Sequence, residues 1–204
     1  MIRNIIFDLG GVLIDWNPDY VFDKLFEGRP QDKQYFYEHI CTPDWNEEQD
    51  AGRSLQEATE LLVTRHPEWK EHIEAYYGRW EEMLGGPIAG TVEIFRRIKE
   101  EDRFGLYALT NWSAELFPIA LQRYDFLHWF HGRLVSGEEK MRKPAREFYQ
   151  LILDRFNLDP STTLFIDDNK RNIDAAAAMG IQCIWFRSPE QLETELRSRN
   201  VLQD

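Results

Sequence analysis

The chain has few cysteines, no long apolar run and no excess of positive charge. Only Cys41 and Cys183 are cysteines among 204 residues, too few for a disulfide framework or a paired metal-binding knuckle. We interpret them as reduced thiols in a cytoplasmic protein. No apolar segment approaches the ~20 residues of a membrane-spanning helix. The apolar stretch from Ile5 to Ile14 is interrupted by Asp8 and lacks the flanks of a secretion signal.

Acidic residues outnumber basic ones by 36 to 24, which gives a formal net charge of -12. Such a chain repels polyanions, so we expect no nucleic acid as a partner, and the lack of a long apolar run predicts no membrane partner. A small anionic substrate remains compatible, because a metal ion and a few cations can reverse the field locally. We expect a monomer or weak dimer with one good core and a small second lobe.

Short apolar runs alternate with helical patterns outside residues 17–87. A strand followed by a helix, repeated along the chain, predicts a parallel sheet covered on both faces, an α/β fold. The predicted strands are Ile2–Asp8, Gly105–Thr110, Arg133–Ser136, Thr163–Asp167 and Gln182–Phe186.

Residues 17–87 interrupt this alternation with successive helical patterns and no convincing strand. The predicted helices are Asp19–Phe26, Gln31–Ile40, Ser54–Arg65 and Glu68–Leu84. Ser54 and Glu57 form a capping box at the start of one of them. Gly85-Gly86-Pro87 then predicts a flexible exit. We therefore predict a core domain of residues 1–16 and 88–204 with a helical insertion, residues 17–87, after the first strand.

Two segments with polar side chains follow predicted strands near residues 8 and 110. Asp8 ends the first strand, and the turn through Gly10 and Gly11 can present backbone amides to an oxyanion. The Thr110 hydroxyl and the Asn111 amide can bind phosphate oxygens beside a helix expected to begin around Ser113. Taken alone, each segment is also typical of a simple loop or helix cap.

Two further segments add a cation and a pair of carboxylates. Lys143 precedes Pro144, which suits the first turn of a helix and would fix the lysine at a rigid junction. The same basic residues are also typical of a solvated surface cluster. Asp167 and Asp168 follow an apolar strand, with Asn172 shortly after. Oxygen ligands of this kind suit magnesium, while a helix N-terminus also favours acidic residues.

Together the segments FDLGGVLID, LTN, RKP and IDDN, in this order, resemble the four motifs of the haloacid dehalogenase superfamily, and the resemblance covers essentially the whole chain. It implies a three-layered Rossmann-like domain with an inserted helical cap of the C1 type, as in subfamily I. The DLGG pattern resembles the sugar-1-phosphate phosphatase branch, of the glucose-1-phosphatase type. Phosphatases of this superfamily hydrolyse small phosphorylated metabolites with Mg²⁺.

By resemblance, Asp8 would be the nucleophile and would form an aspartyl-phosphate. Thr110, Asn111, Lys143 and the turn through Gly10 and Gly11 would hold the phosphoryl group, with Lys143 balancing the charge. Mg²⁺ would bind three groups, with support from two more side chains. Those metal ligands are Asp8, the Gly10 backbone carbonyl and Asp168, and the supporting residues are Asp167 and Asn172.

One position departs from the phosphatase pattern. Phosphatases of the superfamily usually carry a general acid/base Asp two residues after the nucleophile, where this chain has Gly10. A good leaving group, such as an anomeric sugar oxygen or an acyl phosphate, would need less help from that acid. Two alternatives stay open: a 2-haloacid dehalogenase that uses the same Asp without metal, and a non-catalytic phosphate-binding module. Residues expected to face the substrate from the insertion side are Trp16, Asn17, Trp45, Asn46 and Arg53, whereas Tyr76, Tyr77 and Trp80 are interpreted as core.

Overall fold

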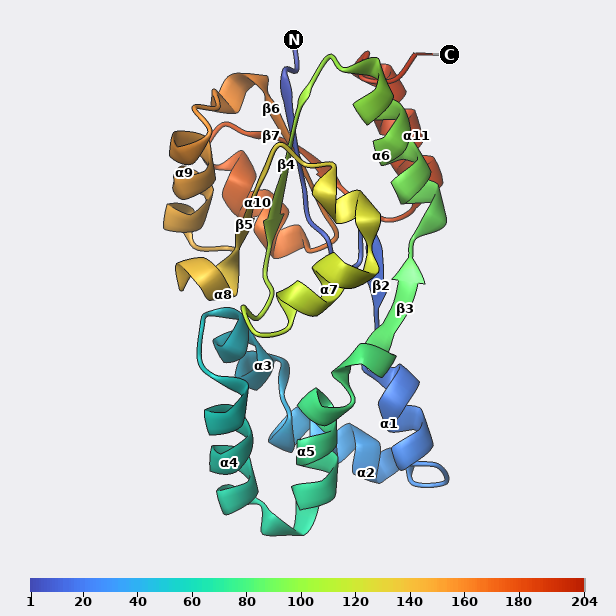
Figure 1. Ribbon diagram of the computed structural model, residues 1–204, viewed down its shortest axis with the longest axis vertical. Helices are drawn as coiled ribbons and strands as arrows, with labels where there is room; N and C mark the ends of the chain where they lie inside the picture. Colours follow the sequence, from blue (N-terminus) through green and yellow to red (C-terminus); the bar gives the residue numbers. More distant parts are fainter. Residues whose placement is uncertain (204) are drawn as a thin grey trace.

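A five-stranded parallel sheet forms the centre of the upper half of the molecule in Figure 1. The computed structural model describes residues 1–203. The strand order is β5-β4-β1-β6-β7, and every neighbouring pair is parallel. The strands are β1 (Asn4–Phe7), β4 (Gly105–Thr110), β5 (Gly132–Val135), β6 (Thr163–Asp167) and β7 (Gln182–Trp185). The predicted α/β fold with a parallel Rossmann-like sheet is therefore confirmed.

Helices cover both faces of this sheet. α6 (Ala89–Glu101) and α11 (Pro189–Ser198) pack together on one face, and α9 (Arg146–Arg155) and α10 (Lys170–Ala177) lie on the other. Alternate side chains of β1 enter different cores: Ile5 and Phe7 join the cluster that includes α6 and α11, whereas Ile6 joins the cluster of α9 and α10. This alternation follows from the two-residue period of a strand. It produces three layers with the carboxyl ends of the strands at one edge.

Two helix starts near the predicted site differ from the sequence-based expectation. The helix expected from Ser113 begins later, as α7 (Phe117–Arg123), because a turn occupies the intervening residues and Pro118 favours the first turn. Pro144 follows Lys143 through a cis peptide bond and lies outside the next helix, α9. The remaining short helices of this part are η4 (Asp125–His128), α8 (Ser136–Glu139) and η5 (Pro160–Thr162).

The helical insertion forms the lower half of the molecule in Figure 1. Its helices are α1 (Asp19–Leu25), α2 (Pro30–Tyr35), η1 (Phe36–Ile40), α3 (Pro43–Asp50), α4 (Leu55–Arg65), η2 (Pro67–Trp69), α5 (Lys70–Gly78) and η3 (Trp80–Met83). The single helix predicted over Glu68–Leu84 is wrong, since it is broken into η2, α5 and η3. α3 was not predicted, although Thr42 caps it by accepting a hydrogen bond from the Trp45 N–H at 3.1 Å.

Two strands connect the insertion to the sheet domain, and they correct the prediction of a flexible exit. β2 (Ile14–Trp16) pairs antiparallel with β3 (Leu84–Pro87) in a two-stranded ribbon. The glycines of β3 permit this pairing, because a Cβ at Gly85 would lie 2.1 Å from the Asp15 carboxylate. These glycines suggested flexibility because they carry no side chain. Here the lack of a side chain instead lets the two strands approach closely.

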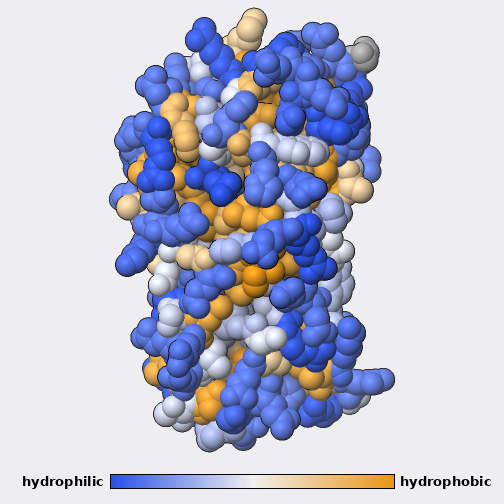
Figure 2. Space-filling view, viewed as in Figure 1, coloured by the Kyte–Doolittle hydropathy of each residue, from blue (hydrophilic) through white to orange (hydrophobic). Residues whose placement is uncertain are grey.

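The face of the molecule in Figure 2 is mostly polar. Hydrophilic side chains cover most of the face in Figure 2, with smaller apolar patches across the middle of the molecule. Among residues 1–203 no helix combines the length and the apolar character that crossing a bilayer demands.

Candidate active site

Asp8 lies directly after β1, at the carboxyl edge of the sheet. Its backbone N–H donates to the carbonyl oxygen of Ile166 at 2.8 Å, so hydrogen bonding to the neighbouring strand fixes its position. The side chain is only 8% exposed, and its Oδ1 accepts a hydrogen bond from the Leu9 N–H at 2.7 Å. Open α/β sheets place their ligand sites at this edge.

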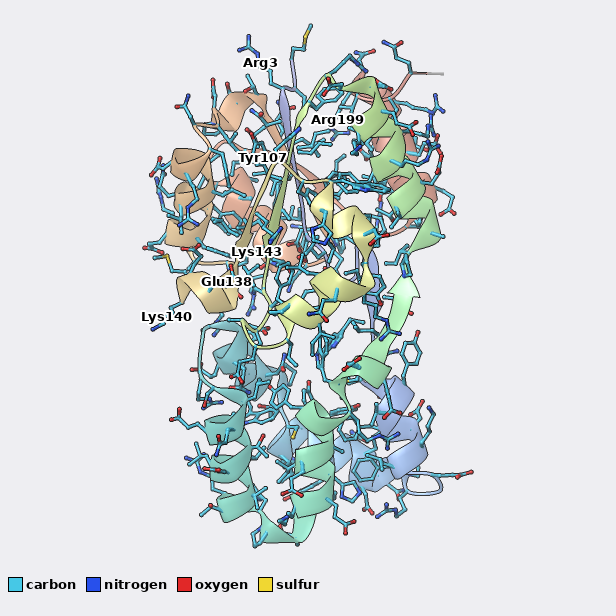
Figure 3. All side chains as sticks on the ribbon, viewed as in Figure 1. Arg3, Tyr107, Glu138, Lys140, Lys143 and Arg199 are labelled. Carbon is cyan, nitrogen blue, oxygen red and sulfur yellow. The ribbon has the colours of Figure 1, made fainter. Side chains whose placement is uncertain are left out.

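Lys143 is fully buried and lies between two carboxylates. Its Nζ is 2.9 Å from Asp8 Oδ1 and 2.7 Å from Asp167 Oδ2. Burial alone would lower the pKa of this ammonium, but Asp167 and Asp8 outweigh burial and the pKa is raised. Lys143 is therefore a fixed positive charge. Figure 3 places it inside the domain, whereas Lys140 lies at the outer edge.

Asp167 and Asp168 have different surroundings although they are adjacent. Asp167 is fully buried, and besides Lys143 it accepts hydrogen bonds from Asn172 Nδ2, 3.1 Å from each carboxylate oxygen, and from the Asn169 N–H at 2.7 Å. Asp168 is exposed. A Cβ at Gly11 would lie 2.2 Å from Asp168 Oδ2, so only glycine lets this carboxylate rest against the turn after Asp8. Asp167 holds the lysine, while Asp168 is accessible to a ligand.

The three carboxylates form an arrangement that fits a divalent cation. One oxygen from each of Asp8, Asp167 and Asp168 lies within 4.8 Å of the other two. Burial raises the pKa of Asp8 to about 8, Lys143 opposes this shift, and Asp167 and Asp168 add to it. Burial and Asp167 likewise raise the pKa of Asp168. One ammonium thus faces three acidic groups, and a hard cation with oxygen ligands would offset the excess negative charge.

Thr110 and Asn111 lie at the end of β4, next to the lysine. The Thr110 hydroxyl oxygen is buried and has no hydrogen-bond partner within residues 1–203, which is costly unless a ligand or water satisfies it. Asn111 Nδ2 donates to the Lys143 carbonyl at 3.0 Å, and the Lys143 N–H donates to Asn111 Oδ1 at 2.8 Å. Asn111 therefore holds the lysine backbone, and one amide hydrogen remains for a ligand.

A cavity of about 90 Å³ lies between the helical insertion and the sheet domain. This volume is large enough for several water molecules, since each needs roughly 10–15 Å³. Its lining comprises Gly10, Trp16, Asn46, Asp50, Tyr77, Trp80, Asn111, Trp112, Ser113 and Leu116. Of the insertion-side residues expected to face a substrate, Trp16 and Asn46 line it and Asn17, Trp45 and Arg53 do not. Tyr77 and Trp80, expected in the core, do line it. Asp50 was missed by the sequence reasoning.

Glu47 of α3 connects the insertion to two arginines of the sheet domain, an arrangement we call the Glu47 bridge. Its carboxylate pairs with Arg142 and, at 2.9 Å, with Arg171. These arginines immediately precede Lys143 and Asn172 in the sequence. The bridge therefore ties α3 to the two segments that carry the buried ion pair.

Comparison with known proteins identifies the family. Residues 2–180 match the haloacid dehalogenase-like hydrolase family, and the chain belongs to it. The sesquiterpene phosphatase astK of Aspergillus oryzae is 27% identical over 86% of this chain and 85% of its own length. The phosphorylated carbohydrates phosphatase of Thermotoga maritima is 26% identical over 89% of this chain and 83% of its own length. The drimenol cyclase drtB of Aspergillus calidoustus is 22% identical over 96% of this chain, which spans 36% of that protein.

Solved structures share the fold. A haloacid dehalogenase family enzyme from Bacteroides thetaiotaomicron in complex with magnesium has a TM-score of 0.73 at 21% identity, covering 96% of this chain and 98% of that one. The L-2-haloacid dehalogenase from Xanthobacter autotrophicus has a TM-score of 0.63 at 16% identity, covering 100% and 85%. The prediction of a hydrolytic enzyme of this superfamily is confirmed, and the phosphatases among its relatives support a phosphoric monoester hydrolase. Because the fold is common to phosphatases and a dehalogenase, the site must discriminate between them.

Proposed function

We propose that this protein is a Mg²⁺-dependent phosphatase that hydrolyses a small phosphomonoester through an aspartyl-phosphate on Asp8. The observation that carries the proposal is the buried Lys143 ammonium, 2.9 Å from Asp8 and 2.7 Å from Asp167, beside a cluster of three carboxylates. A nucleophilic carboxylate and a phosphate dianion repel each other, and such a site supplies the opposing charge.

The mechanism assigns one task to each group. An Asp8 oxygen attacks phosphorus, and the bond from phosphorus to the leaving oxygen breaks. Lys143 neutralises charge on Asp8 and the transferring phosphoryl group, and the unpaired Thr110 hydroxyl donates to a phosphoryl oxygen. Asp8, Asp168 and the Gly10 carbonyl would hold Mg²⁺, with Asp167 and Asn172 supporting them. The ion, when bound, supplies charge neutralisation. Water then attacks phosphorus and releases phosphate from Asp8.

The helical insertion, residues 17–87, would act as a C1-type cap of a subfamily I enzyme over a core domain of residues 1–16 and 88–204. Trp16, Asn46, Tyr77 and Trp80 face the cavity and would contact the leaving group. Aromatic rings with a few amide groups suit a sugar ring, whose faces are apolar and whose edges are hydroxylated. A sugar phosphate, including the sugar-1-phosphate type, is the substrate class that we propose.

The test is a phosphate-release screen over sugar phosphates, nucleotides and small phosphomonoesters, with Mg²⁺ or with EDTA. We expect turnover that depends on Mg²⁺, returns when Mg²⁺ is restored, and disappears in Asp8→Asn. In the wild type, beryllium fluoride with Mg²⁺ should raise the melting temperature, and Asp8→Asn should lose this effect. Stabilisation without turnover of any substrate would instead identify a non-catalytic phosphate-binding module.

A dehalogenase reaction would use the same nucleophile without a metal. The carboxylates of Asp167 and Asp168 argue against it, because a halide leaving group and a metal-free site need no such concentration of negative charge. Chloride release from 2-chloropropionate that persists in EDTA, with no phosphate release, would overturn the phosphatase proposal.

A further inference from the structure

The turn after Asp8 contains no proton donor for the leaving group. Gly10 stands two residues after the nucleophile, and a Cβ at this position would meet no atom within 4 Å. Gly10 also lacks the positive φ that makes other glycines of the chain irreplaceable. The sequence therefore leaves open space beside the nucleophile, and the cavity between the insertion and the sheet domain extends to this space.

Asp50 lines the same cavity. It is the last residue of α3, and it is the one carboxylic acid among the described residues that line the cavity. The charge of Lys143 and the Ser113 backbone amide both act on its carboxylate. Asp50 therefore lies within electrostatic reach of the lysine that contacts Asp8, although the two aspartates are 42 positions apart in the sequence.

The end of α3 is held against the sheet domain on both sides of Asp50. On one side, the Glu47 bridge joins α3 to Arg142 and Arg171. On the other, a Cβ at Gly52 would lie 3.1 Å from the Lys140 side chain and 3.3 Å from a backbone carbonyl, which shows how closely the chain passes. Asp50 is thus carried by an anchored helix end rather than by a free loop.

We propose that Asp50 is the general acid and base of the reaction, in place of the residue missing at Gly10. This inference rests on the proposed phosphatase function. In the first step Asp8 bonds to phosphorus, the leaving oxygen departs, and the Asp50 carboxyl gives that oxygen its proton. In the second step the Asp50 carboxylate takes a proton from water as the water oxygen attacks phosphorus. The Asp8–phosphorus bond then breaks, and Asp50 is again protonated.

The protonation behaviour of Asp50 suits both steps. Burial raises its pKa to about 7, although Lys143 and the Ser113 amide oppose the shift. Asp50 in turn acts on Tyr76 and Tyr77, and burial raises the pKa values of both tyrosines above the usual range. A group with a pKa near neutrality donates and accepts protons efficiently near pH 7. The tyrosines hold their protons too tightly for this exchange.

The experiment compares the wild type with Asp50→Asn, a variant of the same shape, on an alkyl phosphate and on p-nitrophenyl phosphate in Mg²⁺. For the alkyl phosphate, whose leaving group needs a proton, we expect kcat/KM to fall about 10²–10⁴-fold. For p-nitrophenyl phosphate we expect kcat/KM within a few-fold of wild type. Its kcat should fall, with a burst of p-nitrophenol and accumulation of phosphorylated Asp8, because the base for the second step is missing.

A second variant separates loss of the proton donor from misfolding. Asp50→Asn combined with Gly10→Asp places a carboxyl group in the open space of the turn, and we expect it to recover at least tenfold in kcat/KM for the alkyl phosphate. Gly10→Asp alone serves as the control for damage to the turn. In the wild type, kcat/KM for the alkyl phosphate should decline as pH rises above about 7, and Asp50→Asn should lose this decline.

Each result has a definite meaning. Equal losses of kcat/KM on both substrates, or no loss on either, would overturn the role of Asp50 while leaving the phosphatase proposal standing. Absence of phosphate release by the wild type from every phosphomonoester, with Mg²⁺ present, would overturn the proposed function itself.

Discussion

Replacing Lys143 with methionine removes a fully buried ammonium and leaves its two carboxylate partners without their cation. Lys143 Nζ lies 2.9 Å from Asp8 and 2.7 Å from Asp167, and none of the three side chains is more than about a tenth exposed. Breaking a buried ion pair from one side costs about 3–5 kcal/mol, because the remaining charge has lost its compensation. For a protein of this size, this corresponds to a fall in melting temperature of about 6–20 °C.

The assay is urea unfolding in EDTA, so that no metal ion replaces the lost charge. Lys143→Met combined with Asp167→Asn should recover at least half of the lost free energy of unfolding, since the double variant no longer buries an unpaired Asp167 carboxylate. Lys140→Met is the matched control: Lys140 is exposed, and its replacement should change stability by less than about 0.5 kcal/mol. The reasoning would be refuted if Lys143→Met unfolded like the wild type, or if the double variant were no more stable than the single one.

Three further predictions test neighbouring features. Gly11→Ala adds a Cβ 2.2 Å from Asp168 Oδ2, so the Mg²⁺ concentration for half-maximal activity should rise about tenfold or more. Gly28→Ala is the control: Gly28 has a similar φ and open space around it, and its replacement should leave that concentration unchanged. The pKa of Asp50 is raised from 3.8 to about 7, so the native state keeps a proton that the unfolded chain releases. Its contribution to wild-type stability should therefore fall as pH rises from about 4 through 7. Asp50→Asn should remove up to about 4 kcal/mol of that fall, and identical pH profiles in urea unfolding would contradict this. Glu47→Gln weakens a partly exposed bridge and should lower the free energy of unfolding by no more than about 2 kcal/mol while raising KM several-fold. An unchanged KM would show that the bridge does not position α3 for substrate binding.

The sheet was predictable because each of its strands is a short apolar run with a helical pattern beside it. Asp8 and Asp167 were recognisable for the same reason, since a carboxylate at the end of a buried strand is costly without a function or a partner. Lys143 was placed near them only through the resemblance of the four segments to the haloacid dehalogenase motifs. The sequence did not show that the lysine is fully buried between the two carboxylates, because that depends on the pairing of β1 with β6 and on the Asn111 contacts.

The insertion was less predictable, for two physical reasons. β3 consists of leucine, two glycines and proline, a composition of low strand propensity, and it forms only because β2 offers it a partner. α3 begins at Pro43 and is polar, so it carries no apolar periodicity to reveal it. Asp50 belongs to a run rich in acidic residues, where nothing local separates it from Glu47 or Glu48. Only the tertiary arrangement turns this one carboxyl group toward the cavity.

The β2–β3 ribbon brings the two ends of the insertion together. The chain leaves the sheet domain and returns to it along paired strands, with Ile14 opposite Pro87. Paired strands lie about 5 Å apart, a gap that one or two residues can span. A different lobe joined at these two positions would leave the strand order of the sheet unchanged, but it would have to supply its own counterpart of Asp50. Specificity can therefore diverge through changes in the inserted lobe while Asp8 and Lys143 keep their places in the sheet domain.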